Sequence, residues 1–393
     1  MMRQTLLHPL FFLLLICVPT FGQTPFPFNE TGYGNVMKQA KSENKSVLYM
    51  MYAAWCPHCH KMRDEVFADK EVSDLLQKNF LVAAQDVELE GGRDLARKFS
   101  VSSYPTFVVL DKDGNFLYGF NGELKKPDFI AELNEAKNPE KQLPYLKKNF
   151  GNDPSDGNKA LALILALRKA SLSANEVALK YLSTQKDEQL VNALNWKILA
   201  NGVSEIESRP FQYVLSHQKE FASVSSEKRV ARKIENIAME ALKNPAEKGD
   251  TIGYKKQRVL VKSIRMRKTD SLAYVYDKFL YEKVRDWKAY QNATIHSVDD
   301  FDAKNYSSLR NTAAVYLTEI SDKEALKTAV KWSEKATSLQ ESKDGYLQTA
   351  KLYEKIGDKT KAIAAAQTAR EFCIRVGFGT KDADELLKKL QSK

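Results

Sequence analysis

Residues 47–59 read VLYMMYAAWCPHC, and they carry most of the information about the first third of the chain. Val47 to Tyr52 is an unbroken apolar run of strand length, which is typical of a central strand covered on both faces. Cys56 and Cys59 follow, and Pro57 between them suits the first turn of a helix, where no N–H partner is lost. The pattern predicts a strand that passes into a helix, with Cys56 at the helix N-terminus.

The sequence around this stretch alternates between helix and strand patterns. Asp113-Gly114 is a hairpin signal between two of the expected strands. Short apolar runs predict the further strands at 80–84, 107–110 and 116–120, and spaced apolar residues predict helices at 33–44, 59–76, 93–99 and 127–136. This alternation indicates an α/β domain over residues 23–140.

Beyond this domain the character of the sequence changes. Prolines, glycines and polar residues punctuate residues 141–158, which indicates a linker. Helix patterns then dominate, so we expect an α-helical domain over residues 159–393. Its end, residues 310–376, resembles a tetratricopeptide helix pair, because small residues recur one repeat length apart and let neighbouring helices approach closely. These residues are Ala329 and Ala336, then Ala362 and Ala369.

The N-terminus predicts export. Arg3 gives a short positive start, and Leu10 to Val18 is an apolar stretch that is too short to span a bilayer. We therefore interpret residues 1–22 as a cleaved secretory signal, with a retained N-terminal anchor as the alternative, and expect a periplasmic or secreted protein. No later stretch has the run of about 20 apolar residues that a spanning helix needs, so we expect no stable membrane insertion.

Charge and cysteine content narrow the choice of function. The formal charge of +10 is scattered, and the densest basic run, Arg258 to Lys268, interleaves apolar residues as a solvated helix face does. No nucleic acid is therefore expected as a partner. After the signal only Cys56, Cys59 and Cys373 remain, too few for a disulfide scaffold. Cys373 stands in an apolar context, which predicts an inert buried thiol.

The Cys56/Cys59 pair predicts redox chemistry. A cysteine at a helix N-terminus faces free backbone N–H groups and the positive end of the helix dipole, and both stabilise its thiolate. Cys56 is therefore the expected nucleophile, and Cys59 is expected to close the disulfide. His58 can add a positive charge or a hydrogen bond to the Cys56 thiolate, which would stabilise the reduced form and make the disulfide a stronger oxidant.

Two motifs together resemble the thioredoxin superfamily over residues 30–136: Trp55-Cys56-Pro57-His58-Cys59 after an apolar strand, and Tyr104-Pro105-Thr106 before another. The resemblance implies a thioredoxin-like fold and a thiol–disulfide oxidoreductase that acts on protein thiols or disulfides and needs a redox partner protein. It also implies that Pro105 is a cis-proline beside the dithiol, and that the Tyr104 backbone and Trp55 dock the substrate. No cofactor or metal is expected.

The two motifs point to different directions of electron flow. The Cys-Pro-His-Cys tetrad matches periplasmic disulfide-forming oxidases, whereas Tyr-Pro-Thr is closer to protein disulfide isomerases. Thioredoxins carry a buried aspartate six residues before the first cysteine, where this chain has Met50. The oxidase or isomerase direction is therefore favoured over the reductase direction.

The same residues also fit two metal-binding patterns. Cys56 to His60 also fits the C-x-x-C-H pattern of haem attachment, but the motif lies at the strand-to-helix junction of an α/β unit that Tyr104-Pro105 completes. A zinc site usually draws on two separated ligand pairs, and His217 and His296 stand alone. The alternative function is a helical-repeat protein-binding module whose thioredoxin-like domain is a redox sensor or an accessory.

Overall fold

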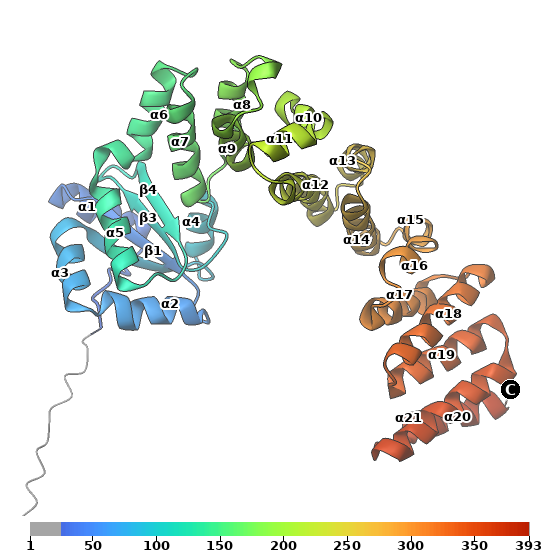
Figure 1. Cartoon of the computed structure of the whole chain (residues 1–393). Coiled ribbons are helices and arrows are strands. Elements are labelled where there is room, and N and C mark those ends of the chain that lie inside the picture. Colours follow the sequence, from blue (N-terminus) through green and yellow to red (C-terminus); the bar gives the residue numbers. More distant parts are fainter. Residues whose placement is uncertain (1–24, 393) are drawn as a thin grey trace, which may run out of the picture. The chain divides into compact units, whose positions relative to one another are not determined.

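The computed structural model describes residues 25–392 (Figure 1). The expected signal, residues 1–22, lies outside the described residues. The chain divides into two compact units, residues 1–186 and 187–393. Among the described residues, none of the helices combines the length and the apolar character that a membrane crossing needs.

A mixed four-stranded sheet forms the centre of the first unit, in the order β2-β1-β3-β4. Its strands are β1 (Val47–Tyr52), β2 (Leu81–Asp86), β3 (Thr106–Leu110) and β4 (Phe116–Asn121). β2 runs parallel to β1, and β3 runs antiparallel to it, with Met51 opposite Thr106. The antiparallel pairing therefore brings the start of β3, directly after Pro105, to the end of β1, where the dithiol segment begins.

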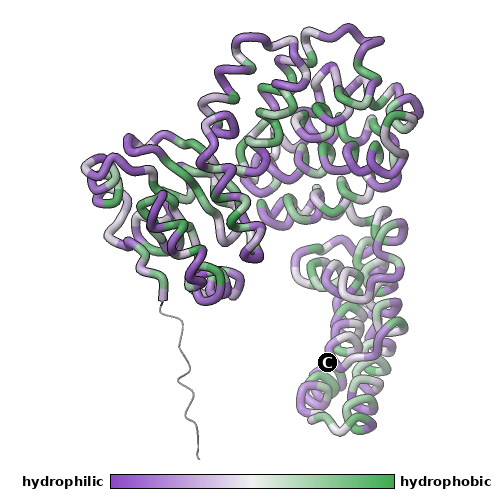
Figure 2. Tube along the Cα trace, turned by 60° about the vertical axis from the view of Figure 1, so that its left-hand side comes forward, coloured by the Kyte–Doolittle hydropathy of each residue, from purple (hydrophilic) through white to green (hydrophobic). Residues whose placement is uncertain are grey.

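Helices cover both faces of this sheet, which confirms the expected α/β fold class. Leu48 and Met50 of β1 face one apolar core, and Tyr49 and Met51 face the other. Figure 2 shows the strands as hydrophobic stretches inside this unit. The first core holds residues of α2 (Pro57–Lys61), η1 (Met62–Phe67), α3 (Lys70–Asn79) and α5 (Lys126–Lys137), and the second holds residues of α1 (Tyr33–Glu43) and α4 (Gly92–Lys98).

The helix expected at 59–76 is divided into three parts. After α2 the chain forms a π-helical turn, η1, and α3 then begins at Lys70, with Asp69 as its N-cap. The Asp69 carboxylate accepts hydrogen bonds from the N–H groups of Glu71 and Val72, which satisfies two donors that a helix N-terminus leaves free. The π-turn places Met62 and Phe67 in the core beneath the dithiol.

The segment expected as a linker, residues 141–158, begins at the last residue of a short 3-10 turn, η2 (Pro139–Lys141), and contains helix α6 (Leu143–Asn152) and the start of α7 (Gly157–Lys169). Pro144 lies in the first turn of α6, where its missing N–H costs nothing, so this proline opens a helix. Both helices contact β4 (Figure 1). They belong to the first unit, which ends after α8 (Asn175–Leu182).

The end of α7 packs against β4, the outer strand of the sheet. Lys169 Nζ lies 2.9 Å from the Tyr118 hydroxyl, on one face of β4. A Cβ built on Gly119, the next residue of the strand, would lie 3.0 Å from the Cβ of Ala170. Because neighbouring residues of a strand point to opposite faces, α7 ends at the edge of β4.

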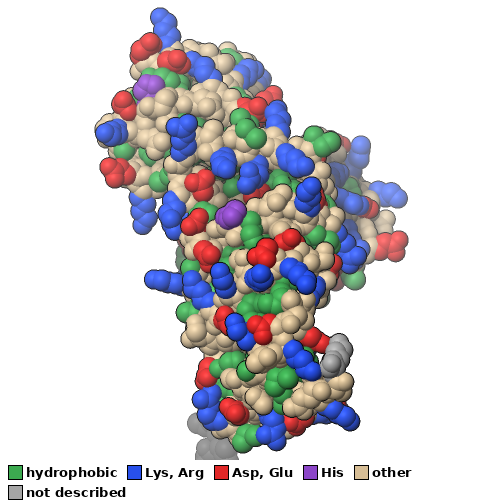
Figure 3. All heavy atoms as spheres, turned by 90° about the vertical axis from the view of Figure 1, so that its right-hand side faces the viewer, with side chains coloured by type: hydrophobic (Ala, Val, Ile, Leu, Met, Phe, Trp, Pro, Cys, Tyr) green, Lys and Arg blue, Asp and Glu red, His purple; other side chains and the backbone are tan. Residues whose placement is uncertain are grey.

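The second unit is all-helical in the described residues apart from short turns and connections. It begins with the short 3-10 turn η3 (Asp187–Gln189). The helices are α9 (Ala193–Gly202), α10 (Arg209–Ser216), α11 (Gln218–Ser223), α12 (Glu227–Lys248), α13 (Thr251–Ser263), α14 (Arg267–Lys283), α15 (Trp287–Thr294), α16 (Ser297–Phe301), α17 (Tyr306–Glu319), α18 (Lys323–Leu339), α19 (Lys343–Ile356), α20 (Lys359–Val376) and α21 (Lys381–Ser392). On the face in Figure 3, basic and acidic side chains are interspersed.

Small buried residues line the contacts of the last helices. Ala350 of α19 and Ala362 and Ala369 of α20 are fully buried, and Gly357, with a φ of 91°, ends α19 in a left-handed conformation. Cys373 is buried in α20, as its apolar context predicts. The tetratricopeptide-like repeat over 310–376 stays a prediction.

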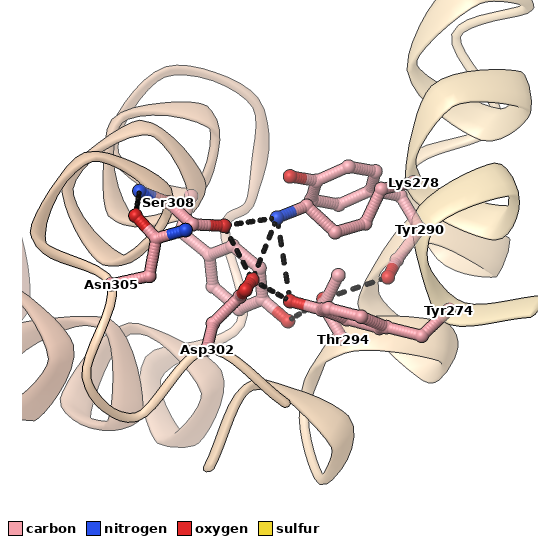
Figure 4. Close-up of polar contacts among 8 residues, drawn as sticks. Tyr274, Lys278, Tyr290, Thr294, Asp302, Asn305 and Ser308 are labelled. Carbon is pink, nitrogen blue, oxygen red and sulfur yellow. Dashed lines mark hydrogen bonds and ion pairs between the residues drawn. The ribbon is translucent and has the colours of Figure 1, made fainter. Parts of the chain in front are cut away.

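A polar cluster ties α14 to α17 inside this unit (Figure 4). Lys278 Nζ lies 3.2 Å from an oxygen of Asp302 and 2.9 Å from the Ser308 hydroxyl. The Tyr274 hydroxyl donates to the same Asp302 oxygen at 2.5 Å. Burial favours a higher pKa for Asp302, but hydrogen bonds from Ser308 and Tyr274 and the charge of Lys278 outweigh it, so the pKa of Asp302 is lowered.

Candidate active site

The two cysteines lie together where β1 gives way to α2. Cys56 is the N-cap residue of α2, and its sulfur accepts the N–H of Cys59 at 3.3 Å. The two Sγ atoms are 2.7 Å apart, and both cysteines are free. A disulfide bond is about 2.05 Å long, so a small displacement would join them. Both residues are buried, with 3% of Cys56 and 1% of Cys59 exposed.

The surroundings of Cys59 keep it protonated. Burial, followed by its hydrogen bond to Cys56, raises the pKa of the Cys59 thiol to about 12. Met50 is fully buried in the same apolar core and offers no proton acceptor. At neutral pH, Cys59 is therefore a thiol.

The second predicted motif lies beside the dithiol segment. The Tyr104–Pro105 peptide bond is cis, as the resemblance implied. The rings of Trp55 and Tyr104 meet edge to face, with their centroids 6.0 Å apart. Trp55 is 65% exposed although it directly precedes a buried cysteine. The structure thus brings the two motifs together and leaves an aromatic surface open next to the sulfur atoms.

His58 does not make the contact expected from the sequence. Its Nδ1 lies 2.6 Å from a carboxylate oxygen of Glu123, and Lys61 forms an ion pair with the other oxygen of the same carboxylate. The hydrogen bond from Lys61, and then that from His58, lower the pKa of Glu123. The side chain expected to serve Cys56 is thus held by a carboxylate from the loop after β4.

Sequence reasoning did not find Glu123, because the residue stands far from the dithiol along the chain. The sequence clue to its position is the preceding glycine, Gly122, which marks a turn at the end of the predicted strand. In the structure Gly122 has a φ of 92° and turns the chain away from the end of β4.

Asp86 is a second residue that sequence reasoning missed. It ends β2, opposite Tyr52 at the end of β1, and is 7% exposed. One carboxylate oxygen accepts the N–H of Ala54 at 3.2 Å, and the other accepts the N–H of Glu88 at 2.9 Å. Asp86 therefore fixes the backbone just before Trp55. A polar residue at the carboxyl end of a strand parallel to β1 was the signal, since such ends meet at one edge of a sheet.

Both the haem-attachment pattern and the zinc-site alternative would use His60. Its Nε2 lies 2.7 Å from the carbonyl oxygen of Ala54, so the ring contacts the backbone of the segment before the dithiol. Within residues 25–392 no three or more His, Cys, Asp or Glu side chains are grouped so as to hold a metal ion.

The family comparison agrees with this geometry. Residues 33–137 match the model of a thioredoxin-like domain. This part of the chain is a thioredoxin-like domain. Its sheet, the cysteine pair at the start of α2 and the cis Tyr104–Pro105 bond all lie within the matched residues.

Several known proteins are similar to the thioredoxin-like domain. Protein disulfide-isomerase A4 of Bos taurus is 33% identical over 103 residues, which are 26% of this chain and 15% of that protein. Protein disulfide isomerase-like 2-2 of Oryza sativa subsp. japonica is 23% identical over 146 residues, 37% of each protein. A solution structure of a thioredoxin from Thermus thermophilus is 29% identical, covers 28% of this chain and 85% of that one, and gives a TM-score of 0.26. The chain thus spans much less than two thirds of the length of these two isomerases.

Proposed function

We propose that this protein is an exported thiol–disulfide oxidoreductase that exchanges disulfides with other proteins through Cys56 and Cys59. The observation that carries the proposal is the pair of free sulfur atoms, 2.7 Å apart, at the N-terminus of α2. The exposed Trp55 ring beside Tyr104 supports a docking role for this surface. The similarity to protein disulfide isomerases supports the reaction class, and the N-terminal sequence supports export to a periplasmic or extracellular compartment.

In the oxidising direction the reaction begins with the Cys56–Cys59 disulfide. A substrate thiolate attacks Cys56 Sγ, a mixed disulfide forms, and Cys59 leaves as a thiolate that takes up a proton. A second substrate thiolate then attacks the substrate sulfur of the mixed disulfide and releases Cys56. Two electrons pass from the substrate thiols to the cysteine pair, and a redox partner protein must remove them before the next cycle.

We place the protein on the oxidase or isomerase side. The Cys-Pro-His-Cys tetrad supports this direction; the raised pKa of Cys59 does not select one, because it slows both the attack of Cys59 on a mixed disulfide and the departure of Cys59 from the Cys56–Cys59 disulfide. Met50 stands where thioredoxins have a carboxylate that helps deprotonate the resolving cysteine. The helical unit, residues 187–393, would then hold a substrate or the redox partner.

The test is the reduction potential of the purified full chain, equilibrated with glutathione buffers and measured by trapping free thiols. We expect a potential of roughly −120 to −180 mV, the range of disulfide donors and isomerases. A value near roughly −270 mV would identify a reductant. If Cys56 and Cys59 formed no reversible disulfide, the enzyme proposal would fail, and the helical-repeat binding module would be the better proposal. Replacement of Cys373 by Ser is the matched control, because that thiol is buried and lies outside the thioredoxin-like domain.

A further inference from the structure

The loop between β4 and α5 contacts both halves of the candidate site. The N–H of Gly122 donates to the carbonyl oxygen of Pro105 at 2.8 Å. The N–H of Leu124 donates to the sulfur of Met62 at 3.3 Å, directly after the dithiol helix. Glu123 lies between these two anchors. Its position is therefore fixed from both sides by the segments that carry the proposed chemistry.

Glu123 binds His58 and Lys61 of the dithiol helix with one carboxylate. One oxygen meets His58 Nδ1 at 2.6 Å, and the other meets Lys61 Nζ. Glu123 is the less exposed partner, with 27% of its side chain accessible against 64% for His58. Without this carboxylate, the His58 ring would be free to turn toward Cys56, two residues earlier in the chain.

We infer that Glu123 is a positioning residue that holds His58 away from Cys56 and neutralises the positive charge of Lys61 on the same helix. This inference rests on the proposed function. Because a positive charge near Cys56 stabilises its thiolate, and with it the reduced dithiol, Glu123 makes the disulfide less oxidising than the Cys-Pro-His-Cys sequence alone implies. Glu123 thus sets the oxidising strength from outside the motif.

The test is the equilibrium in which the protein disulfide and two glutathione molecules give the dithiol and glutathione disulfide, two electrons passing to the protein. Glu123→Gln keeps the shape of the side chain and removes its charge. We expect a shift of about threefold toward the dithiol, the size of an exposed ion pair. For a two-electron couple this equals about 14 mV toward less negative potential.

Two further variants distinguish the positioning of His58 by Glu123 from the mere loss of a negative charge. In a His58→Ala background, Glu123→Gln should shift the equilibrium by less than half as much, because the ring that Glu123 holds is absent. Asp74→Asn removes an exposed carboxylate paired with Lys70 on α3 and should leave the potential unchanged. Thermal unfolding of each variant checks that the fold is intact.

The possible outcomes are distinct. An unchanged potential in Glu123→Gln, or a full shift in the His58→Ala background, would overturn the inference and leave the oxidoreductase proposal standing. A shift in Asp74→Asn as large as that in Glu123→Gln would overturn it as well. If the unmodified protein has no reversible dithiol, both proposals fail.

Discussion

The buried thiol of Cys59 leads to a kinetic prediction about release of a substrate bound to Cys56. Release by the resolving cysteine requires the Cys59 thiolate. The pKa of this thiol is raised from 9.0 to about 12; burial, the largest cause, persists when Cys56 is bonded to a substrate, whereas the hydrogen bond to Cys56 and the Cys56 charge do not, so the pKa in the mixed disulfide lies between these two values. At pH 7 the thiolate fraction then falls from about 10⁻² toward a lower limit of about 10⁻⁵, a loss of up to about a thousandfold.

The higher basicity of this thiolate offsets part of the loss. Thiolate nucleophilicity rises with pKa by a Brønsted coefficient of about 0.45, which over three pKa units gives about twentyfold. The net prediction is a resolving step slower at pH 7 than for an ordinary cysteine, by up to about fiftyfold. Its rate should rise tenfold per pH unit over the whole range in which the protein stays folded.

A peptide with an activated aryl disulfide tests this prediction. Attack by Cys56 releases the coloured aryl thiol in a first phase, and attack by Cys59 releases the peptide in a second, which acid quenching and chromatography follow. In Cys59→Ser the second phase should disappear, which assigns it. A second-phase rate that levels off between about pH 8 and 9, the ordinary range for a cysteine, would refute the reasoning.

Three further predictions concern stability. Phe107 is fully buried against Phe120 and Phe129, and Phe107→Ala should cost about 3–5 kcal/mol in urea unfolding of the full chain; a cost below about 1 kcal/mol would contradict this packing. Asp277 is buried and bonds Arg258 through both carboxylate oxygens, so Asp277→Asn should cost about 3 kcal/mol, measured in the same way. The lowered pKa of Asp302 means that its contribution is present above about pH 4 and lost as pH falls through the folded-state value. Asp302→Asn should therefore destabilise the protein at pH 7, and the difference from the unmodified chain should shrink below about pH 4; an equal difference at both pH values would show that the charge is not responsible.

Local patterns were enough to predict the centre of the thioredoxin-like domain. The strand at Val47–Tyr52 was predicted with its observed bounds, since an unbroken apolar run and its length are local properties. The pairing of Glu123 with His58 was not predictable in this way, because it depends on which loop the antiparallel β4 delivers to the dithiol helix. Pro144 was interpreted as part of a linker, whereas it lies in the first turn of α6. A proline is compatible with either a loop or a helix start, and the residues after it decide between them.

The packing of Ala170 against Gly119 limits how far the chain can be truncated from its C-terminal end without exposing β4. A protein that ended at residue 140 would lack α6 and α7 and would leave the outer N–H and C=O groups of β4 without cover. Such an edge is a template on which a second copy can add a strand. We expect residues 25–186 to give a monomer in light scattering and residues 25–140 to self-associate. The smallest portable redox module of this protein would then be longer than the thioredoxin-like match, which ends at residue 137.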